Sequence, residues 1–213
     1  MRYVSLVLGL SMVLAATLTQ AAQDVTEDGL VRVPSSRKVS VYRAPAVPFH
    51  RYQRIVIAPI PVVFRKTWIR ENHDLKPQEI DRLKEEFATA FREELVEELV
   101  ERGGYELAET VGPDTLRVEP YVLNVNIVAP QASAEARSHT YLRSGNSMKV
   151  AIELRDAAST VIVGRIINMV QPEEWSIPQF ASKVSNLSDA RSQFANTARF
   201  TREALNVANA QRD

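Results

Sequence analysis

The sequence predicts a single α+β domain, in which a mostly antiparallel sheet carries two long helices on one face. A signal peptide and an extended linker precede this domain. Two observations predict the class: segments with the apolar pattern of strands lie between two long segments with helical periodicity, and no internal repeat occurs. The 213 residues, 45% of them hydrophobic, suit one domain with a substantial core. The absence of cysteine excludes a disulfide scaffold, a thiol enzyme and a zinc site built on thiolates.

Residues 1–21 have the three-part layout of a secretory signal peptide. Met1 and Arg2 give a positive start, Tyr3 to Ala16 is almost wholly apolar, and a small, polar segment ends at Ala21. We expect cleavage after this residue. An uncleaved anchor is the alternative, but the apolar segment is shorter than the about 20 residues that a spanning helix needs.

Leu14-Ala15-Ala16-Thr17 looks like a bacterial lipoprotein box with threonine in the position of the acylated cysteine. Such strings are also common in signal peptides. Without a thiol no lipid can be attached there, so we expect an exported, periplasmic protein without a lipid anchor. Peripheral contact with the outer membrane stays open.

Residues 22–50 show no sustained periodicity and contain three prolines and several serines. We therefore expect an extended linker, in which Lys38 to Tyr42 is a candidate short strand. The α+β domain then covers residues 51–211. Its first strand is the apolar segment Arg54 to Ala58, which Pro59 and Pro61 end or confine to an edge.

Lys76 to Arg102 is predicted as the first long helix. Pro77 suits the first turn, and Gly103-Gly104 suits the stop. Apolar residues recur at three and four positions and form one stripe, which must pack on the sheet: Ile80, Leu83, Phe87, Phe91, Leu95 and Leu99.

Further strands are expected after this helix. Tyr105 to Ala108 is a short strand, and a turn at residues 112–114 leads to a strand at Leu116 to Val128. In this strand Pro120 indicates an edge or bulge, and one face is expected to carry Tyr121, Leu123, Val125 and Ile127. Residues 148–170 read as a hairpin.

Ser185 to Gln211 is predicted as the second long helix. One of its faces is rich in small residues, which suggests close packing against the sheet or the first helix: Leu187, Ala190, Phe194, Ala198, Thr201, Leu205 and Ala208.

Charge is balanced overall but unevenly distributed. Removing residues 1–21 deletes Arg2 from the 26 basic and 26 acidic residues and leaves a net charge of −1, which argues against a nucleic-acid-binding protein. Residues 31–70 hold nine basic residues and no acid, whereas residues 79–101 hold nine acids and three bases. The basic segment could fold back on the acidic helix, meet anionic lipid headgroups, or simply be solvated.

These tracts and two tryptophans in predicted loops define a candidate interaction surface. Its residues are Arg32, Arg37, Lys38, Arg43, Trp68, Glu94, Glu97, Glu98, Glu101 and Trp175. The alternatives are a solvated face for the charges and a cover over the edge of the core for the tryptophans.

No catalytic, metal or cofactor site is expected. No two of the three histidines have metal-ligand spacing, and no phosphate-binding glycine loop or nucleophile elbow occurs. Glu71, His73 and Asp74 share a predicted loop and could bind a cation, but a solvated loop is the simpler interpretation. The many acid pairs lie on a predicted helix surface.

Several segments between residues 50 and 210 resemble a bacterial envelope family, the domain of unknown function 3313 family. They are Tyr52-Gln53-Arg54-Ile55-Val56-Ile57-Ala58-Pro59, the helix after Leu75, Gly112-Pro113-Asp114-Thr115-Leu116-Arg117-Val118, Leu123-Asn124-Val125, and Val150-Ala151-Ile152-Glu153-Leu154-Arg155-Asp156. The resemblance implies an exported, often lipidated protein of Gram-negative bacteria, without an established activity. The chain departs from the lipidated members at Thr17, and has Ala158-Ser159 where members tend to carry Thr-Gly.

Three function classes follow from these features. We expect first a non-enzymatic periplasmic binding or accessory module for an envelope protein partner. The second is a periplasmic carrier of lipid or another small ligand, which predicts an apolar pocket between sheet and helices. The third, a hydrolase, needs convergent polar groups in a cleft and has few histidines to supply them.

Overall fold

A computed structural model describes residues 25–35, 38–127, 141–144, 146–171, 174–180 and 183–210. The predicted signal peptide lies outside these residues. Among the described helices, none is both long and apolar enough to cross a membrane.

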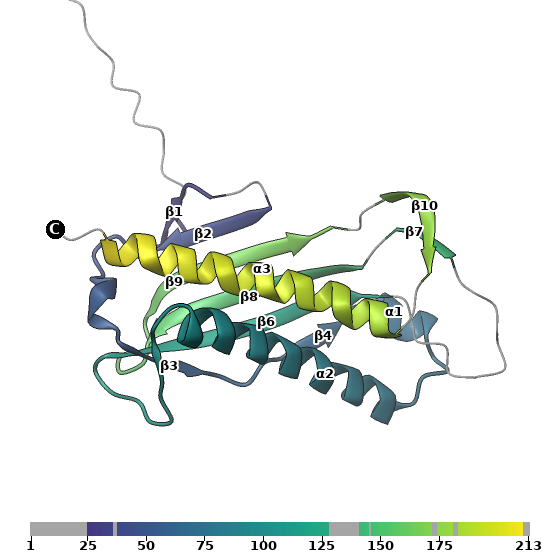
Figure 1. The fold of residues 1–213 in the computed structure, drawn as a ribbon, viewed down its shortest axis with the longest axis horizontal. Coiled ribbons are helices and arrows are strands. Elements are labelled where there is room, and N and C mark those ends of the chain that lie inside the picture. Colours follow the sequence, from purple (N-terminus) through teal and green to yellow (C-terminus); the bar gives the residue numbers. More distant parts are fainter. Residues whose placement is uncertain are drawn as a thin grey trace, which may run out of the picture.

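One mixed sheet forms the centre of the fold (Figure 1), with the strand order β1-β2-β9-β8-β6-β3-β5 and with β4 also paired to β6. The pairs of β3 with β5 and β6, and of β4 with β6, are parallel; the others are antiparallel, which confirms the predicted sheet. The strands are β1 (Val31–Val33), β2 (Val39–Arg43), β3 (Arg54–Ile57), β4 (Val62–Phe64), β5 (Glu106–Leu107), β6 (Thr115–Asn126), β8 (Ser147–Asp156) and β9 (Ile162–Val170).

Two long helices lie side by side over one face of this sheet (Figure 1), as predicted. They are α2 (Pro77–Leu95), continued by the π-helical turns of η2 (Val96–Glu101), and α3 (Lys183–Ala210). The Phe194 ring of α3 stacks on Phe91 of α2 with ring centroids 4.8 Å apart. This contact joins the helices through the core rather than at its rim.

The sequence features at the ends of α2 have the expected roles. Pro77 is the first helical residue, and the backbone N–H of Lys76 donates to Glu79 Oε2 at 2.8 Å. Gly104 has a φ of +76° and follows the last turn, a conformation that glycine adopts without steric strain. The predicted stripe is buried from Leu83 to Leu99, whereas Ile80 is partly buried.

The extended linker predicted for residues 22–50 is corrected by β1, β2 and the short helix η1 (Phe49–Arg51). β2 pairs with β9 over five residues, with Val39 opposite Asn168 and Arg43 opposite Gly164. Leu30, Val39 and Phe49 are buried. The candidate strand at residues 38–42 is thus an inner strand of the sheet, and the domain starts well before residue 51.

Two predictions for β6 are wrong. Pro120 lies in an inner strand and not at an edge. Its missing N–H is tolerated because it falls at the gap between β3 and β4, where Val118 accepts a hydrogen bond from the Ala58 N–H and Val122 donates one to the Pro61 carbonyl. Asn124 has a φ of +54° at a shift in register, which reverses the alternation of faces. Before this shift Val122 enters the core while Tyr121 and Leu123 are only partly buried, and after it Val125 and Ile127 enter the core, so the predicted face holds for its second half alone.

Three further elements were not expected. The short helix α1 (Lys66–Glu71) follows β4, and β7 (Tyr141–Ser144) pairs with β10 (Glu174–Phe180) in a separate two-stranded sheet.

Candidate functional site

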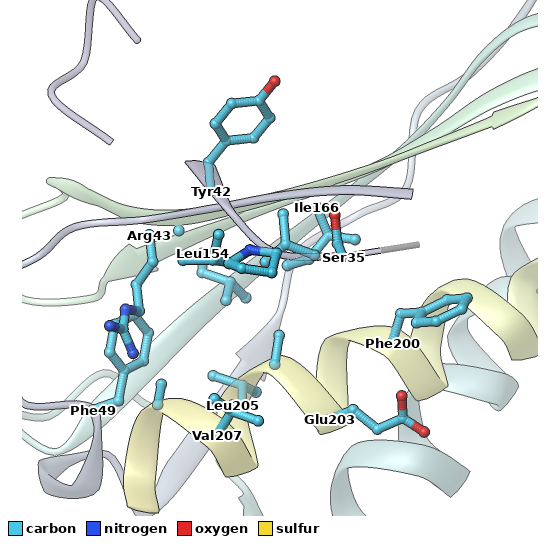
Figure 2. Close-up of a pocket in the computed structure, with 16 residues that line it drawn as sticks. Ser35, Tyr42, Arg43, Phe49, Leu154, Ile166, Phe200, Glu203, Leu205 and Val207 are labelled. Carbon is cyan, nitrogen blue, oxygen red and sulfur yellow. The ribbon is translucent and has the colours of Figure 1, made fainter. Parts of the chain in front are cut away.

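A largely apolar cavity of about 560 Å³ lies between the sheet and α3 (Figure 2). Its volume falls within the range of about 300–1,000 Å³ that is usual for small-molecule sites. The walls come from three separate parts of the chain: the β1–β2 region with Phe49, the β8–β9 pair, and the second half of α3. The lining residues are Val33, Pro34, Ser35, Val41, Tyr42, Arg43, Phe49, Leu154, Gly164, Ile166, Phe200, Glu203, Ala204, Leu205, Val207 and Ala208.

Small residues keep the cavity open on two of its walls. Ala204 and Ala208 lie four residues apart on α3, so they face the same side of the helix. Gly164 of β9 also lines the cavity; a Cβ there would be 3.2 Å from Leu154 Cδ1 and 3.4 Å from the Tyr42 carbonyl oxygen. The small face predicted for the second helix therefore borders a cavity along part of its length.

Arg43, Glu203 and Ser35 supply polar side chains to the lining, whereas the Tyr42 side chain points away from the cavity (Figure 2). The Ser35 hydroxyl donates to the Val39 carbonyl at 2.6 Å. Within the part of the chain that the structure describes, the side chains of Arg43 and Glu203 make no ion pair or hydrogen bond.

A buried carboxylate fixes the chain beside Phe49. Asp156 accepts hydrogen bonds from the Tyr52 hydroxyl at 3.0 Å and from the Ser159 N–H and hydroxyl at 2.8 Å, and it forms an ion pair with Arg51. Burial tends to raise the pKa of Asp156, but these hydrogen bonds and the Arg51 charge outweigh it and lower the pKa to about 2. Burial and the bond to Asp156 raise the pKa of Tyr52 to about 12.

Arginines of α3 pair with part of the acidic surface of α2 and η2. Arg191 bridges Glu93 and Glu94 at 2.6 and 3.1 Å. Arg202 donates to Glu98 at 2.8 Å. Within the basic segment 31–70, Arg51 and Arg54 pair with Asp156 and Asp114 and not with this helix, so the fold-back alternative does not hold for these two residues.

Two residues of the predicted interaction surface are buried, and their assignment is wrong. Glu98 is 3% exposed; burial tends to raise its pKa, but hydrogen bonds from Arg202 and Arg102 outweigh burial and lower it. Trp68 is 2% exposed, stacks on Phe64 with centroids 4.5 Å apart, and donates its indole N–H to the Ile127 carbonyl at 2.6 Å. Trp68 thus covers the end of the core, as the alternative interpretation stated.

The other predicted surface residues are not brought together. Glu94 and Glu97 have the partners Arg191 and Arg102, respectively, and Glu101 is exposed. Arg43 is half-buried at the cavity, while Arg32 and Lys38 are exposed near β1 and β2. Arg37 and the side chain of Trp175 lie outside the described residues, although the Trp175 backbone belongs to β10 rather than to the predicted loop. Lipid contact by this basic segment stays a prediction.

The sheet face opposite the helices carries a chain of ion pairs. Arg155 donates to Glu119 of β6 at 2.8 Å and to Glu153 at 2.7 Å, and Arg165 of β9 lies 2.9 Å from Glu153. The chain continues to Arg117 at one end and to Asp28 at the other. Next to it on the same face, Tyr121, Ala151 and Ile167 lie opposite one another in register, and Met169 is 46% exposed.

Sequence reasoning missed Phe49, Phe200, Glu203 and Ala204 as lining residues. The one signal available was the run of small residues on the second helix, which we interpreted as close packing. No group of three histidine, aspartate or glutamate residues among those described could hold a metal ion.

Residues 19–198 match the sequence profile described as "Protein of unknown function (DUF3313)". The chain belongs to the DUF3313 family. This membership confirms the resemblance found in the sequence. No curated protein matches this DUF3313 chain.

Solved structures show low similarity to this DUF3313 protein. A PelC dodecamer from Paraburkholderia phytofirmans is 14% identical, with a TM-score of 0.36, and the match covers 76% of this chain and 94% of that one. A DUF4136 family protein from Bacteroides thetaiotaomicron is 12% identical, with a TM-score of 0.38, covering 78% and 95%. A putative neuraminyllactose-binding hemagglutinin homolog from Helicobacter pylori is 11% identical, with a TM-score of 0.36, covering 78% and 86%. At these scores the likeness carries no argument about ligands, assembly or partners.

Proposed function

We propose that the protein is an exported, non-enzymatic binding protein of the cell envelope that carries an apolar small molecule in the cavity beneath α3. The cavity is the observation that supports this proposal. The carrier alternative predicts an apolar pocket, and a cavity of about 560 Å³ with apolar walls agrees with it. A fully packed interior would have argued against it. The hydroxyl of Ser35 donates to a backbone carbonyl, so it is not placed as an activated nucleophile.

Binding of a neutral, environment-sensitive dye such as N-phenylnaphthylamine tests the proposal. We expect saturable fluorescence enhancement with one dye per chain. Ala204→Phe places a ring in the cavity and is expected to weaken binding about tenfold or more. Asn206→Phe adds the same ring to an exposed position on α3 that does not line the cavity, and is expected to bind like the wild type.

Two results would contradict the carrier proposal. One is the absence of saturable binding by the folded wild-type protein. The other is equal dye affinity in the Ala204→Phe and Asn206→Phe variants, since the dye would then lie elsewhere on the surface. Circular dichroism of both variants shows whether they are folded.

A protein partner is the second candidate function, and the sheet face opposite the helices favours it. Ile167 and the exposed Met169 form an apolar area beside neutralised ion pairs, which is the composition of a recognition surface. A photo-crosslinking residue at position 169, in intact cells, is expected to give one discrete adduct that Ile167→Lys removes. A smear, or an adduct unchanged by Ile167→Lys, would contradict specific docking on this face.

A further inference from the structure

One wall of the cavity carries a cation that has no partner among the described residues. Arg43 is half-buried, lines the cavity from β2, and has no ion pair within the described parts of the chain. A guanidinium next to apolar walls is only partly hydrated, so an anion placed there replaces water and gains a charge-assisted hydrogen bond. The neighbouring cation near Phe49 is different, because Arg51 is already paired with Asp156.

The register of the sheet places Arg43 at one end of the cavity. Val39 lies opposite Asn168, whose side-chain amide donates to Thr197 of α3 at 3.0 Å. From Val39, β2 runs about 13 Å to Arg43, at about 3.3 Å per residue, so Arg43 lies toward the C-terminal half of α3. Figure 2 agrees: Arg43 lies beside Phe49, whereas Phe200 lies at the other end.

The remaining lining residues between these two ends are suited to a hydrocarbon chain. Leu154 and Ile166 form the sheet side, and Leu205 forms part of the helix side. From Phe200 to Val207 the helix advances about 10 Å, at about 1.5 Å per residue. The Glu203 carboxylate lies on the Phe200 side of this path (Figure 2), where it disfavours an anion and leaves the Arg43 end as the place for one.

We propose that the cavity binds an anionic single-chain amphiphile, with its acid head group, a carboxylate or a phosphate, on the Arg43 guanidinium and its chain along α3 toward Phe200. This inference rests on the proposed carrier function and names its ligand class. The guanidinium offers a planar pair of N–H donors that matches either acid, which a neutral head group cannot use in the same way.

Calorimetric titration of the full mature protein with dodecanoate, dodecyl phosphate and dodecanol, each below its micelle concentration, tests the inference. We expect at least one of the two acids to bind about tenfold tighter than the alcohol, as a charge-assisted hydrogen bond implies. Arg43→Gln is expected to remove this preference while keeping the alcohol affinity. Arg70→Gln, at an exposed position of α1 outside the cavity lining, is the matched control and is expected to keep the preference.

The outcomes separate the two proposals. If none of the three probes binds and the dye also fails, the carrier function itself is contradicted. If acids and alcohol bind the wild type equally, the cavity binds apolar chains but the inferred ligand class is wrong. A preference for acids that persists in Arg43→Gln, or that is lost equally in Arg70→Gln, overturns the assignment to Arg43. The relative affinity of carboxylate and phosphate identifies which acid the site prefers.

Discussion

Arg202 of α3 donates from Nε to Glu98 Oε2 of η2 at 2.8 Å, and the carboxylate that it meets is buried. Arg102, four residues along from Glu98, forms a second ion pair with it from the exposed side. The acids near the C-terminal end of this helix oppose its dipole, and these two arginines offset that unfavourable arrangement. The ion pair therefore joins the two long helices at the point where their contact needs a cation.

Removing Arg202 is expected to destabilise the protein by about 2–4 kcal/mol, because a buried carboxylate then loses a hydrogen-bonding partner. Arg202→Leu in urea unfolding measures this. Arg191→Leu is the control: it removes the pairs with Glu93 and Glu94, both more exposed than Glu98, and is expected to change stability by less than about 1 kcal/mol. Equal effects of the two variants would contradict a special role of the Glu98 pair.

Acid is expected to weaken the fold through Asp156. Its pKa is about 2 in the folded chain, below the ordinary value of an aspartate, so the folded state stabilises the ionised form. This contribution, about 2 kcal/mol, is present above pH about 4 and is lost as the pH falls through the folded pKa. In urea unfolding, Asp156→Asn is expected to have a lower free energy of unfolding than the wild type at pH 7, and this difference is expected to disappear toward pH 2. A difference that stays constant with pH would contradict this role of Asp156. Asp81→Asn, at an exposed position of α2, controls for general effects of acid.

Trp68 is expected to be inaccessible to solvent. The protein has two tryptophans, so Trp175→Phe leaves Trp68 as the one fluorophore of this type. Its emission is expected to be blue-shifted and poorly quenched by acrylamide, because the ring is buried and its N–H is bonded to a carbonyl. Efficient quenching in the folded variant would contradict the burial of Trp68 and would support its predicted assignment to the surface.

Export predicts a mature chain that starts at Ala22. Intact mass measurement of protein from the periplasmic fraction of a Gram-negative host is expected to show the loss of residues 1–21. Ala21→Lys blocks the small-residue cleavage site and is expected to retain those residues. A full-length mass for the wild type, or a purely cytosolic product, would contradict export.

The elements that the sequence predicted well carry their signal locally. The stripe of α2 repeats over five helical turns, and Gly104 is at its end. The hairpin of β8 and β9 alternates within one contiguous segment. β1 was hidden because it is three residues long, and the prolines around β1 and β2 are typical of a linker. At Asn124 a single residue with positive φ reverses the faces of β6, and a periodic pattern contains no trace of that reversal.

The carrier alternative predicted an apolar pocket between sheet and helices, but the residues that line it could not be predicted because its walls are distant in sequence. Arg43 was noted as one member of a basic tract, but nothing local distinguishes it from Arg51, whose charge is paired with Asp156. Only the register of β2 on β9 and the position of α3 show which arginine borders an apolar space. The same applies to Glu98, whose burial depends on α3 lying against η2.

The walls of the cavity include β2, near the beginning of the described chain, and α3, near its end, so these two walls are made at different times during synthesis. During translation β2 emerges early, but the cavity is complete only after α3 has emerged and packed against the sheet. Under the proposed carrier function, a ligand is therefore bound only by the finished polypeptide, after any passage through a membrane. A fragment that stops before residue 200 would lack the part of α3 that forms one wall of the cavity.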